Sequence, residues 1–291
     1  KELNETTFGT DAEIITVGEM SSTSMENCYR YGGEKEKELS MVFSFHHLKV
    51  DFMGNEKWVI VPFDFLKLKN ILFTWQKGMS ENHAWNAVFW CNHDQPRVVS
   101  RFGNTEKYWK ESAKMLGTVI HCLRGTPYIY QGEELGMTNP DFQDISQYRD
   151  VESLNHFQIL QDRGLSKENA YQILAIHSRD NSRTSMQWND GKNAGFTEGT
   201  PWIEVNSDYK NINAAKELED ADSVFHYYKK LIQLRKDYDV IAYGEIEPLA
   251  ELHPSVFAYK REYQGESLLV ISNFHGKETR WDAEVDLTDY Q

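Results

Sequence analysis

The chain has 291 residues, 40% of them apolar, and can bury the core of one large domain or of a large and a small one. Its formal net charge of -14 argues against nucleic-acid binding, because a phosphate backbone would repel it. Its apolar runs are far shorter than the roughly 18 residues that a membrane helix requires. We therefore expect a globular protein with no nucleic-acid or membrane partner.

Three cysteines, Cys28, Cys91 and Cys122, are too few and wrongly spaced for a disulfide framework or a zinc site. They fit a reducing compartment, and the first residues hold no apolar stretch typical of a signal peptide. We therefore expect a cytoplasmic protein. Because the chain begins at Lys1 and not at Met, we expect its natural N-terminus to lie upstream.

Four short apolar runs alternate with helical patterns in the first half of the chain, which is typical of a parallel sheet with crossover helices. One such helix follows Asp64, a residue type that caps helix N-termini, and has apolar residues from Leu68 to Met79 at helical spacing. Another runs from Ser112 to Leu123. The four predicted strands, each expected to be buried on both faces, are 14–17, 41–45, 87–91 and 127–130.

A closed (β/α)8 barrel uses eight such units in roughly 250 residues, so we expect half a barrel, completed by another chain or by a segment before Lys1. Residues 139–222 read as a helical insertion within a first domain of 1–238, with helices near 151–163 and 167–179, and a further helix follows at 224–235. Alternating runs at 255–263 and 267–274 predict antiparallel strands of a small, truncated β domain at 239–291.

Two carboxylates follow predicted strands, where active sites of such barrels lie. Glu19 comes directly after the first run, and Asp94 follows the third within Asn92-His93-Asp94. A single acid at a strand end is often only a helix cap. Two acids at corresponding places favour a catalytic pair.

Four segments resemble consecutive motifs of glycoside hydrolase family 13 α-glucosidases, in the order of that family. They are VGEM at 17–20, FWCNHDQPR at 89–97, GTPYIYQGEELGM at 125–137 and SRDNSRTSMQW at 178–188. The resemblance implies that the chain is the second half of a (β/α)8 TIM barrel, strands 5 to 8 with their helices, followed by a partial antiparallel β domain.

The resemblance also implies roles for the acids: Glu19 as general acid/base, and Asp94 as a carboxylate that stabilises the transition state. A retaining enzyme needs a carboxylate nucleophile as well. Asp11, the one Asp upstream of Glu19, precedes the first strand and is in the wrong place. We therefore expect the nucleophile and the family's calcium site upstream of this chain, no cofactor within it, and no activity from these 291 residues alone.

Three further positions suggest a substrate pocket, and two of them match sugar-binding residues of the family. His93 resembles a histidine that contacts the sugar, with a structural histidine as the alternative. Arg183 resembles the arginine that clamps the terminal glucose, with a surface ion pair as the alternative; Ser185 stands where the family usually has Pro. Arg97 is expected to orient Asp94 through a charge-assisted hydrogen bond.

The segment FSFHHLKVDF at 43–52 resembles trehalose-6-phosphate hydrolases more than oligo-1,6-glucosidases. A lysine at the mouth of a sugar pocket can pair with a substrate phosphate, which makes Lys49 the first phosphate-binding candidate and Lys57 the second. A solvated loop lysine is the alternative for both. His46, His47 and Asp51 match no zinc motif, so no metal is expected there.

The expected ligand is thus a phosphorylated or neutral glucose disaccharide. The first hypothesis is hydrolysis of trehalose 6-phosphate to glucose and glucose 6-phosphate by the full-length protein. The alternatives are an oligo-1,6-glucosidase or dextran glucosidase, and a non-catalytic family-13-like subunit, like the heavy chains of amino-acid transporters. Open barrel edges also predict self-association of the chain.

Overall fold

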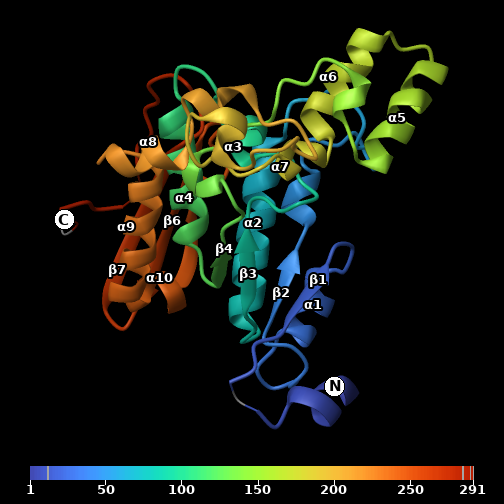
Figure 1. Cartoon of the computed structure of the whole chain (residues 1–291). Helices are drawn as coiled ribbons and strands as arrows, with labels where there is room; N and C mark the ends of the chain where they lie inside the picture. The colour runs from blue at the N-terminus through green and yellow to red at the C-terminus, as the bar shows by residue number, and fades with distance from the viewer. Residues whose placement is uncertain (12, 284, 289, 291) are drawn as a thin grey trace.

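The computed structural model describes residues 1–11, 13–283, 285–288 and 290. A four-stranded, all-parallel sheet runs through the middle of the molecule (Figure 1). Its strands lie in chain order: β1 (Val17–Met20), β2 (Met41–Ser44), β3 (Asn86–Phe89) and β4 (Thr126–Tyr128).

Helices connect these strands and lie beside the sheet: α1 (Met25–Tyr31), α2 (Phe65–Glu81), α3 (Val98–Phe102) and α4 (Trp109–His121). The predicted cap of α2 is confirmed, since the Asp64 carboxylate accepts a hydrogen bond from the Lys67 backbone amide at 2.9 Å. A short 3-10 helix, His46–Lys49, follows β2 and precedes α2.

Two helices after β4, α5 (Val151–Asp162) and α6 (Lys167–His177), project from the rest of the molecule around a hydrophobic cluster of their own (Figure 1). Both helices were predicted within two residues of their ends. The remaining α-helices of the described chain are α7 (Asp180–Arg183), α8 (Ala214–Glu219), α9 (Val224–Asp237) and α10 (Asp239–Tyr243).

A separate antiparallel sheet contains β5 (Glu245–Leu249), β6 (Val256–Tyr263) and β7 (Glu266–Asn273). The largest hydrophobic cluster joins this sheet to the helices of the parallel one. It includes Leu72 of α2, Leu116 of α4 and Phe257 of β6, all buried. The two sheets therefore share one core.

The first predicted strand is displaced. Residues 14–16 lie outside the sheet, and Ile14 and Ile15 are exposed. The strand begins at Val17 and contains Glu19, which the sequence had placed after it. The expectation of burial on both faces is wrong for β1, whose residues are exposed or half-buried, and for β4, whose residues are half-buried. In the described residues β1 also forms a lateral edge of the sheet and pairs only with β2.

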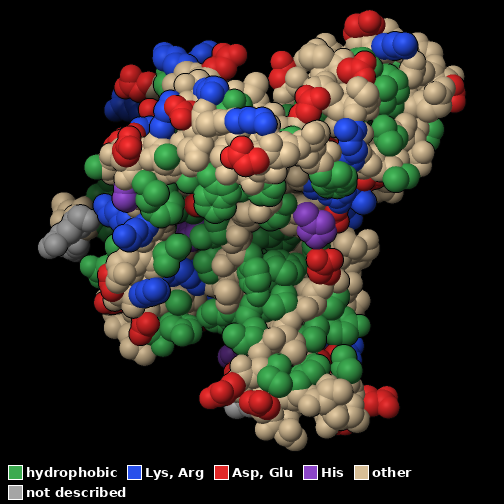
Figure 2. All heavy atoms as spheres, in the orientation of Figure 1, with side chains coloured by type: hydrophobic (Ala, Val, Ile, Leu, Met, Phe, Trp, Pro, Cys, Tyr) green, Lys and Arg blue, Asp and Glu red, His purple; other side chains and the backbone are tan. Residues whose placement is uncertain are grey.

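Aromatic side chains cover one face of the parallel sheet. Phe43 lies edge-on to Phe89 and to Tyr128, with ring centroids 5.0 and 4.7 Å apart. Figure 2 shows a hollow in this part of the surface where hydrophobic side chains gather. In the part of the chain that the structure describes, no helix is long and apolar enough to cross a bilayer.

Candidate active site

Two of the candidate residues line one cavity beyond the parallel strands. Glu19 of β1 and His93 of the loop after β3 both contribute to a cavity of about 170 Å³. Both side chains are exposed. The other walls come mainly from aromatic residues at the carboxyl ends of three strands: Phe43, Phe45, Phe89, Tyr128 and Tyr130. This is the edge of a parallel sheet at which barrel enzymes hold their substrates.

Asp94 is held by charged groups from a distant part of the sequence. Arg183 donates a hydrogen bond from Nη2 to Asp94 Oδ1 at 2.7 Å. Arg179 Nε lies 3.6 Å from the same oxygen, and His93 Nε2 lies 3.6 Å from Oδ2. The Asp94 backbone amide donates to Asn92 Oδ1 at 2.8 Å. The carboxylate is thereby oriented from several sides.

Arg183 joins α7 to the loop after β3. Besides its bond to Asp94, it donates from Nε to the His93 carbonyl at 2.8 Å, and Nη1 lies 3.7 Å from Asp150 Oδ1. Its side chain is 22% exposed. The structure therefore brings the NHD and SRDNSR segments together, with Arg183 beside both His93 and Asp94.

Arg97 does not occupy its expected place. Its side chain is buried and donates to the carbonyls of Gln131 and Ser182, whereas Arg183 holds Asp94. Gly132, with φ of 85°, makes room for it, since a Cβ there would lie 2.9 Å from Arg97 Nη1. The expected bond from Arg97 to Asp94 was wrong. Sequence neighbourhood suggested that bond, but the guanidinium points inward and satisfies the backbone carbonyls of Gln131, after β4, and of Ser182 in α7.

The two candidate phosphate lysines differ in their surroundings. Lys49 is half-buried and donates from Nζ to the Ser21 carbonyl at 2.9 Å, two residues beyond Glu19. Lys57 Nζ lies 3.4 Å from Glu152 Oε2 and 4.6 Å from the centre of the Trp58 ring. Burial lowers the pKa of Lys57, and the Glu152 carboxylate opposes that shift. Lys57 already has an anionic partner, so Lys49 is the better placed of the two.

His47, in the same 3-10 helix as Lys49, bonds the backbone of the neighbouring strand. His47 is buried and shares a hydrogen bond of 2.9 Å between Nε2 and the Phe89 carbonyl. Burial lowers its pKa to about 3, so the ring is neutral near pH 7. Asp51 pairs with Arg101. Among the described residues, no group of three or more His, Cys, Asp or Glu is placed to hold a metal ion, and the absence of a cofactor stays a prediction.

Sequence reasoning missed Arg179 and Glu152. Arg179 Nε lies 2.9 Å from Glu152 Oε2, so it links the carboxylate beside Lys57 to Asp94. The available signal was the spacing of Arg179 and Arg183, four residues apart in one motif, which places two cations on one side of a helical turn. Nothing in the sequence indicated that Glu152 of α5 would lie beside them.

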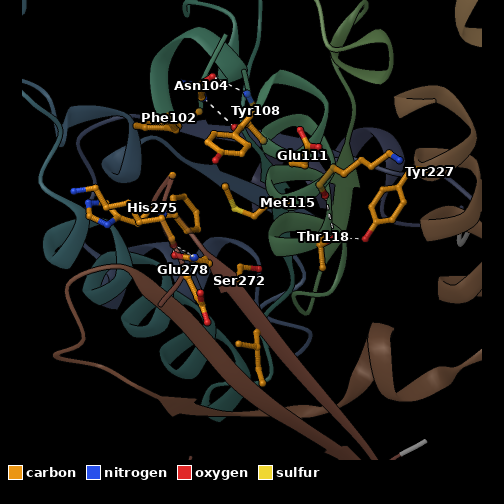
Figure 3. Close-up of a pocket in the computed structure, with 18 of the residues that line it drawn as sticks. Phe102, Asn104, Tyr108, Glu111, Met115, Thr118, Tyr227, Ser272, His275 and Glu278 are labelled. Carbon is orange, nitrogen blue, oxygen red and sulfur yellow. Dashed lines mark hydrogen bonds between the residues drawn. The ribbon is translucent and has the colours of Figure 1, made fainter. Parts of the chain in front are cut away.

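A larger cavity, of about 870 Å³, lies between α4 and β7 (Figure 3). Tyr108, Met115 and Tyr227 line it, and the Tyr227 hydroxyl lies 2.7 Å from Thr118 Oγ1. None of the candidate site residues contributes to it. Size alone therefore does not mark the active site of this chain.

Comparisons with known proteins identify the family of the chain. The model of the alpha amylase catalytic domain matches residues 1–244. The trehalose-6-phosphate hydrolase of Bacillus subtilis is 54% identical over 99% of this chain and 53% of its own length. The oligo-1,6-glucosidase of Bacillus cereus is 50% identical over 95% of the chain and 50% of its own length.

A solved structure, that of trehalose-6-phosphate hydrolase from Bacillus licheniformis, superposes with a TM-score of 0.95 at 54% identity. The superposition covers all of this chain and 52% of the Bacillus licheniformis chain. The chain therefore belongs to the alpha-amylase family, glycoside hydrolase family 13, and its relatives are glycosidases. It spans about half the length of the curated relatives it matches.

Proposed function

We propose that the longer protein containing this chain is a retaining α-glucoside hydrolase that cleaves trehalose 6-phosphate to glucose and glucose 6-phosphate. The proposal is supported mainly by one observation. In a chain of the alpha-amylase family, Glu19 and His93 share a cavity at the carboxyl ends of parallel strands, and Arg183 fixes Asp94 beside His93.

The chemistry assigns a role to each group. Glu19 gives its proton to the glycosidic oxygen while the bond to the glucose anomeric carbon breaks, and a carboxylate nucleophile bonds to that carbon. Water then attacks the anomeric carbon and breaks its bond to the nucleophile, which releases the glucose, and Glu19 takes a proton from that water. Asp94, oriented by Arg183, faces the developing positive charge, and His93 contacts a sugar hydroxyl.

The nucleophile comes from outside these 291 residues. A retaining site needs two carboxylates about 5 Å apart. Among the described residues that line the cavity, Glu19 is the one acid. Residues 1–238 then form strands 5 to 8 of the (β/α)8 barrel with their helices, and 239–291 belong to the β domain. Purified chain is expected to leave p-nitrophenyl α-glucoside uncleaved, and measurable turnover would contradict this assignment.

Lys49 supplies the contact to the substrate phosphate. Its ammonium lies beside the loop that follows Glu19, and pairing with a phosphate offsets the cost of desolvating both charges. Changing Lys49 to Ala in the active protein should raise the KM for trehalose 6-phosphate about tenfold, the worth of one charge-assisted contact. The exposed Lys35, changed to Ala, is the matched control. An unchanged KM for Lys49→Ala would remove the phosphate role.

A direct comparison of substrates tests the function as a whole. The active protein should hydrolyse trehalose 6-phosphate with a higher kcat/KM than isomaltose. Preference for isomaltose would instead favour an oligo-1,6-glucosidase, which the Bacillus cereus relative makes the second candidate. If neither trehalose 6-phosphate nor isomaltose is hydrolysed, the result would favour a non-catalytic binding subunit. A cytoplasmic location stays a prediction.

A further inference from the structure

The segment that carries Lys49 is tied to both neighbouring strands. The 3-10 helix His46–Lys49 follows β2, and the Lys49 ammonium reaches the Ser21 carbonyl beyond β1. On the other side, His47 bonds the Phe89 carbonyl at the end of β3. The segment therefore lies across the carboxyl ends of β1 to β3, where Glu19 and Asp94 also lie.

Arg101 of α3 fastens this segment with a single guanidinium. Nε donates to Asp51 Oδ2 at 2.8 Å, and Nη2 donates to Oδ1 at 2.6 Å and to the Leu48 carbonyl. The side chains of Arg101 and Asp51 are 3% and 7% exposed. Leu48 and Asp51 lie on either side of Lys49 in the sequence, so their bonds fix the backbone that carries it.

The same guanidinium also reaches the loop that carries Asp94. Arg101 Nη1 donates to Gln95 Oε1 at 2.8 Å, and Gln95 is the residue after Asp94. The Gln95 backbone amide in turn donates to the Asn92 carbonyl at 3.2 Å. One buried side chain thus touches both the Lys49 segment and the Asp94 loop.

This arrangement requires arginine. The planar guanidinium grips a carboxylate with two parallel bonds and still has donors for two further acceptors, whereas an ammonium is a point charge with three donors. Because Arg101 and Asp51 are buried, water cannot replace a lost hydrogen bond between them. The segment that carries Lys49 would therefore shift if the guanidinium were removed. The distance between Lys49 and Asp94 therefore depends on Arg101.

We propose that Arg101 is a positioning residue that sets the place of Lys49 relative to Asp94, and through it the selection of phosphorylated over neutral glucosides. The inference rests on the proposed function, since it takes Lys49 as the phosphate contact. Arg101 touches no substrate. It holds the backbone on both sides of the phosphate contact in register with the carboxylate that faces the reacting carbon.

The test compares two substrates in the active protein. Arg101→Lys should raise the KM for trehalose 6-phosphate about tenfold more than the KM for p-nitrophenyl α-glucoside, because a displaced ammonium loses one charge-assisted contact. Arg124→Lys is the matched control. Arg124 also donates to a backbone carbonyl, that of Ala84, which precedes β3 at the opposite end of that strand. A purely structural role for Arg101 would change both KM values alike, as in the control, and would overturn the proposal.

A double-mutant cycle separates this proposal from the one on which it rests. Once Lys49 is Ala, adding Arg101→Lys should leave the ratio of the two KM values unchanged, since the group being positioned is gone. If Lys49→Ala changes the ratio and Arg101→Lys does not, Arg101 has no positioning role. If Lys49→Ala itself leaves the ratio unchanged, the phosphate assignment fails and the inference with it. If Arg101→Lys does not fold, Asp51→Asn replaces it in the test, because that change removes the same bidentate pair. It should change the ratio of the two KM values in the same way.

Discussion

Arg183 is the residue on which the geometry of the candidate site most depends. Lysine in its place keeps the charge but not the planar guanidinium, whose Nη2 and Nε reach Asp94 and the His93 carbonyl from two separate atoms. Arg183→Lys should therefore lower kcat/KM on p-nitrophenyl α-glucoside about ten- to a hundredfold in the active protein, the worth of one hydrogen bond to a charged group. Steady-state kinetics measure this. Arg163→Lys, at an exposed arginine near Glu56, is the control, and equal activity of the two variants would contradict the role of Arg183.

Glu133 should make the stability of the chain depend on pH. The side chain is buried, and desolvation, aided by the Glu134 charge and opposed by a 3.1 Å hydrogen bond from the Tyr228 hydroxyl, raises its pKa from 4.5 to about 8. Between these values the folded chain keeps a proton that the unfolded chain releases. The free energy of unfolding should therefore fall as pH rises through that window.

Glu133→Gln removes the titrating group and keeps the shape of the side chain. Its free energy of unfolding should fall less between pH 5 and pH 8 than that of the unchanged chain, as measured by urea unfolding at several pH values across the range of the shifted pKa. Parallel pH profiles for the two proteins would show that Glu133 is ionised in the folded state, contrary to this expectation.

Among the elements, α2 is joined to the C-terminal sheet by one buried lysine. Lys69 Nζ donates to the carbonyls of Ala250, His253 and Val256 at 2.6, 2.7 and 3.1 Å. Lys69→Met should destabilise the chain by about 3 kcal/mol or more, because three carbonyls lose their partner. Urea unfolding measures the loss. Lys67→Met, at an exposed position of the same helix, should cost less than about 0.5 kcal/mol, and equal losses would contradict the role of Lys69.

The elements also show how far the sequence predicts this fold. Apolar spacing and the Asp64 cap located α2, and the same reasoning located α9 and the strands β6 and β7. The first strand was displaced because Ile14 and Ile15 look like core residues, yet nothing in the described chain covers them. Periodicity reports a preference for burial, and the neighbouring elements decide whether burial occurs.

The site was predictable where a motif carries it and not where partners come from afar. Glu19, His93 and Arg183 could be chosen from local motifs, and the structure brings them near one sheet edge. Arg97 was misplaced because the direction of a side chain depends on packing against Gln131 and Ser182. The contact of Arg101 with Asp51 joins residues 50 positions apart, and that of Lys57 with Glu152 joins residues 95 positions apart, a relation that local spacing does not encode.

At the scale of the whole molecule, the open sheet predicts self-association. In the described chain β1 pairs on one side only, and the aromatic face of the sheet lines an open hollow (Figure 2). Unpaired strand edges and exposed apolar surface favour pairing with another copy. The purified chain should therefore show a mass that rises with concentration in sedimentation equilibrium. A single monomer mass across the concentration range would contradict this expectation.

The most direct test of the proposed function is the rate at which the active protein containing this chain hydrolyses trehalose 6-phosphate, with Glu19 intact and with Glu19→Gln. Hydrolysis should proceed with retention of the anomeric configuration, and kcat of the variant should be lower by at least about a hundredfold, because general acid catalysis contributes that much. Unchanged kcat in Glu19→Gln, or inversion at the anomeric carbon, would contradict the proposed function.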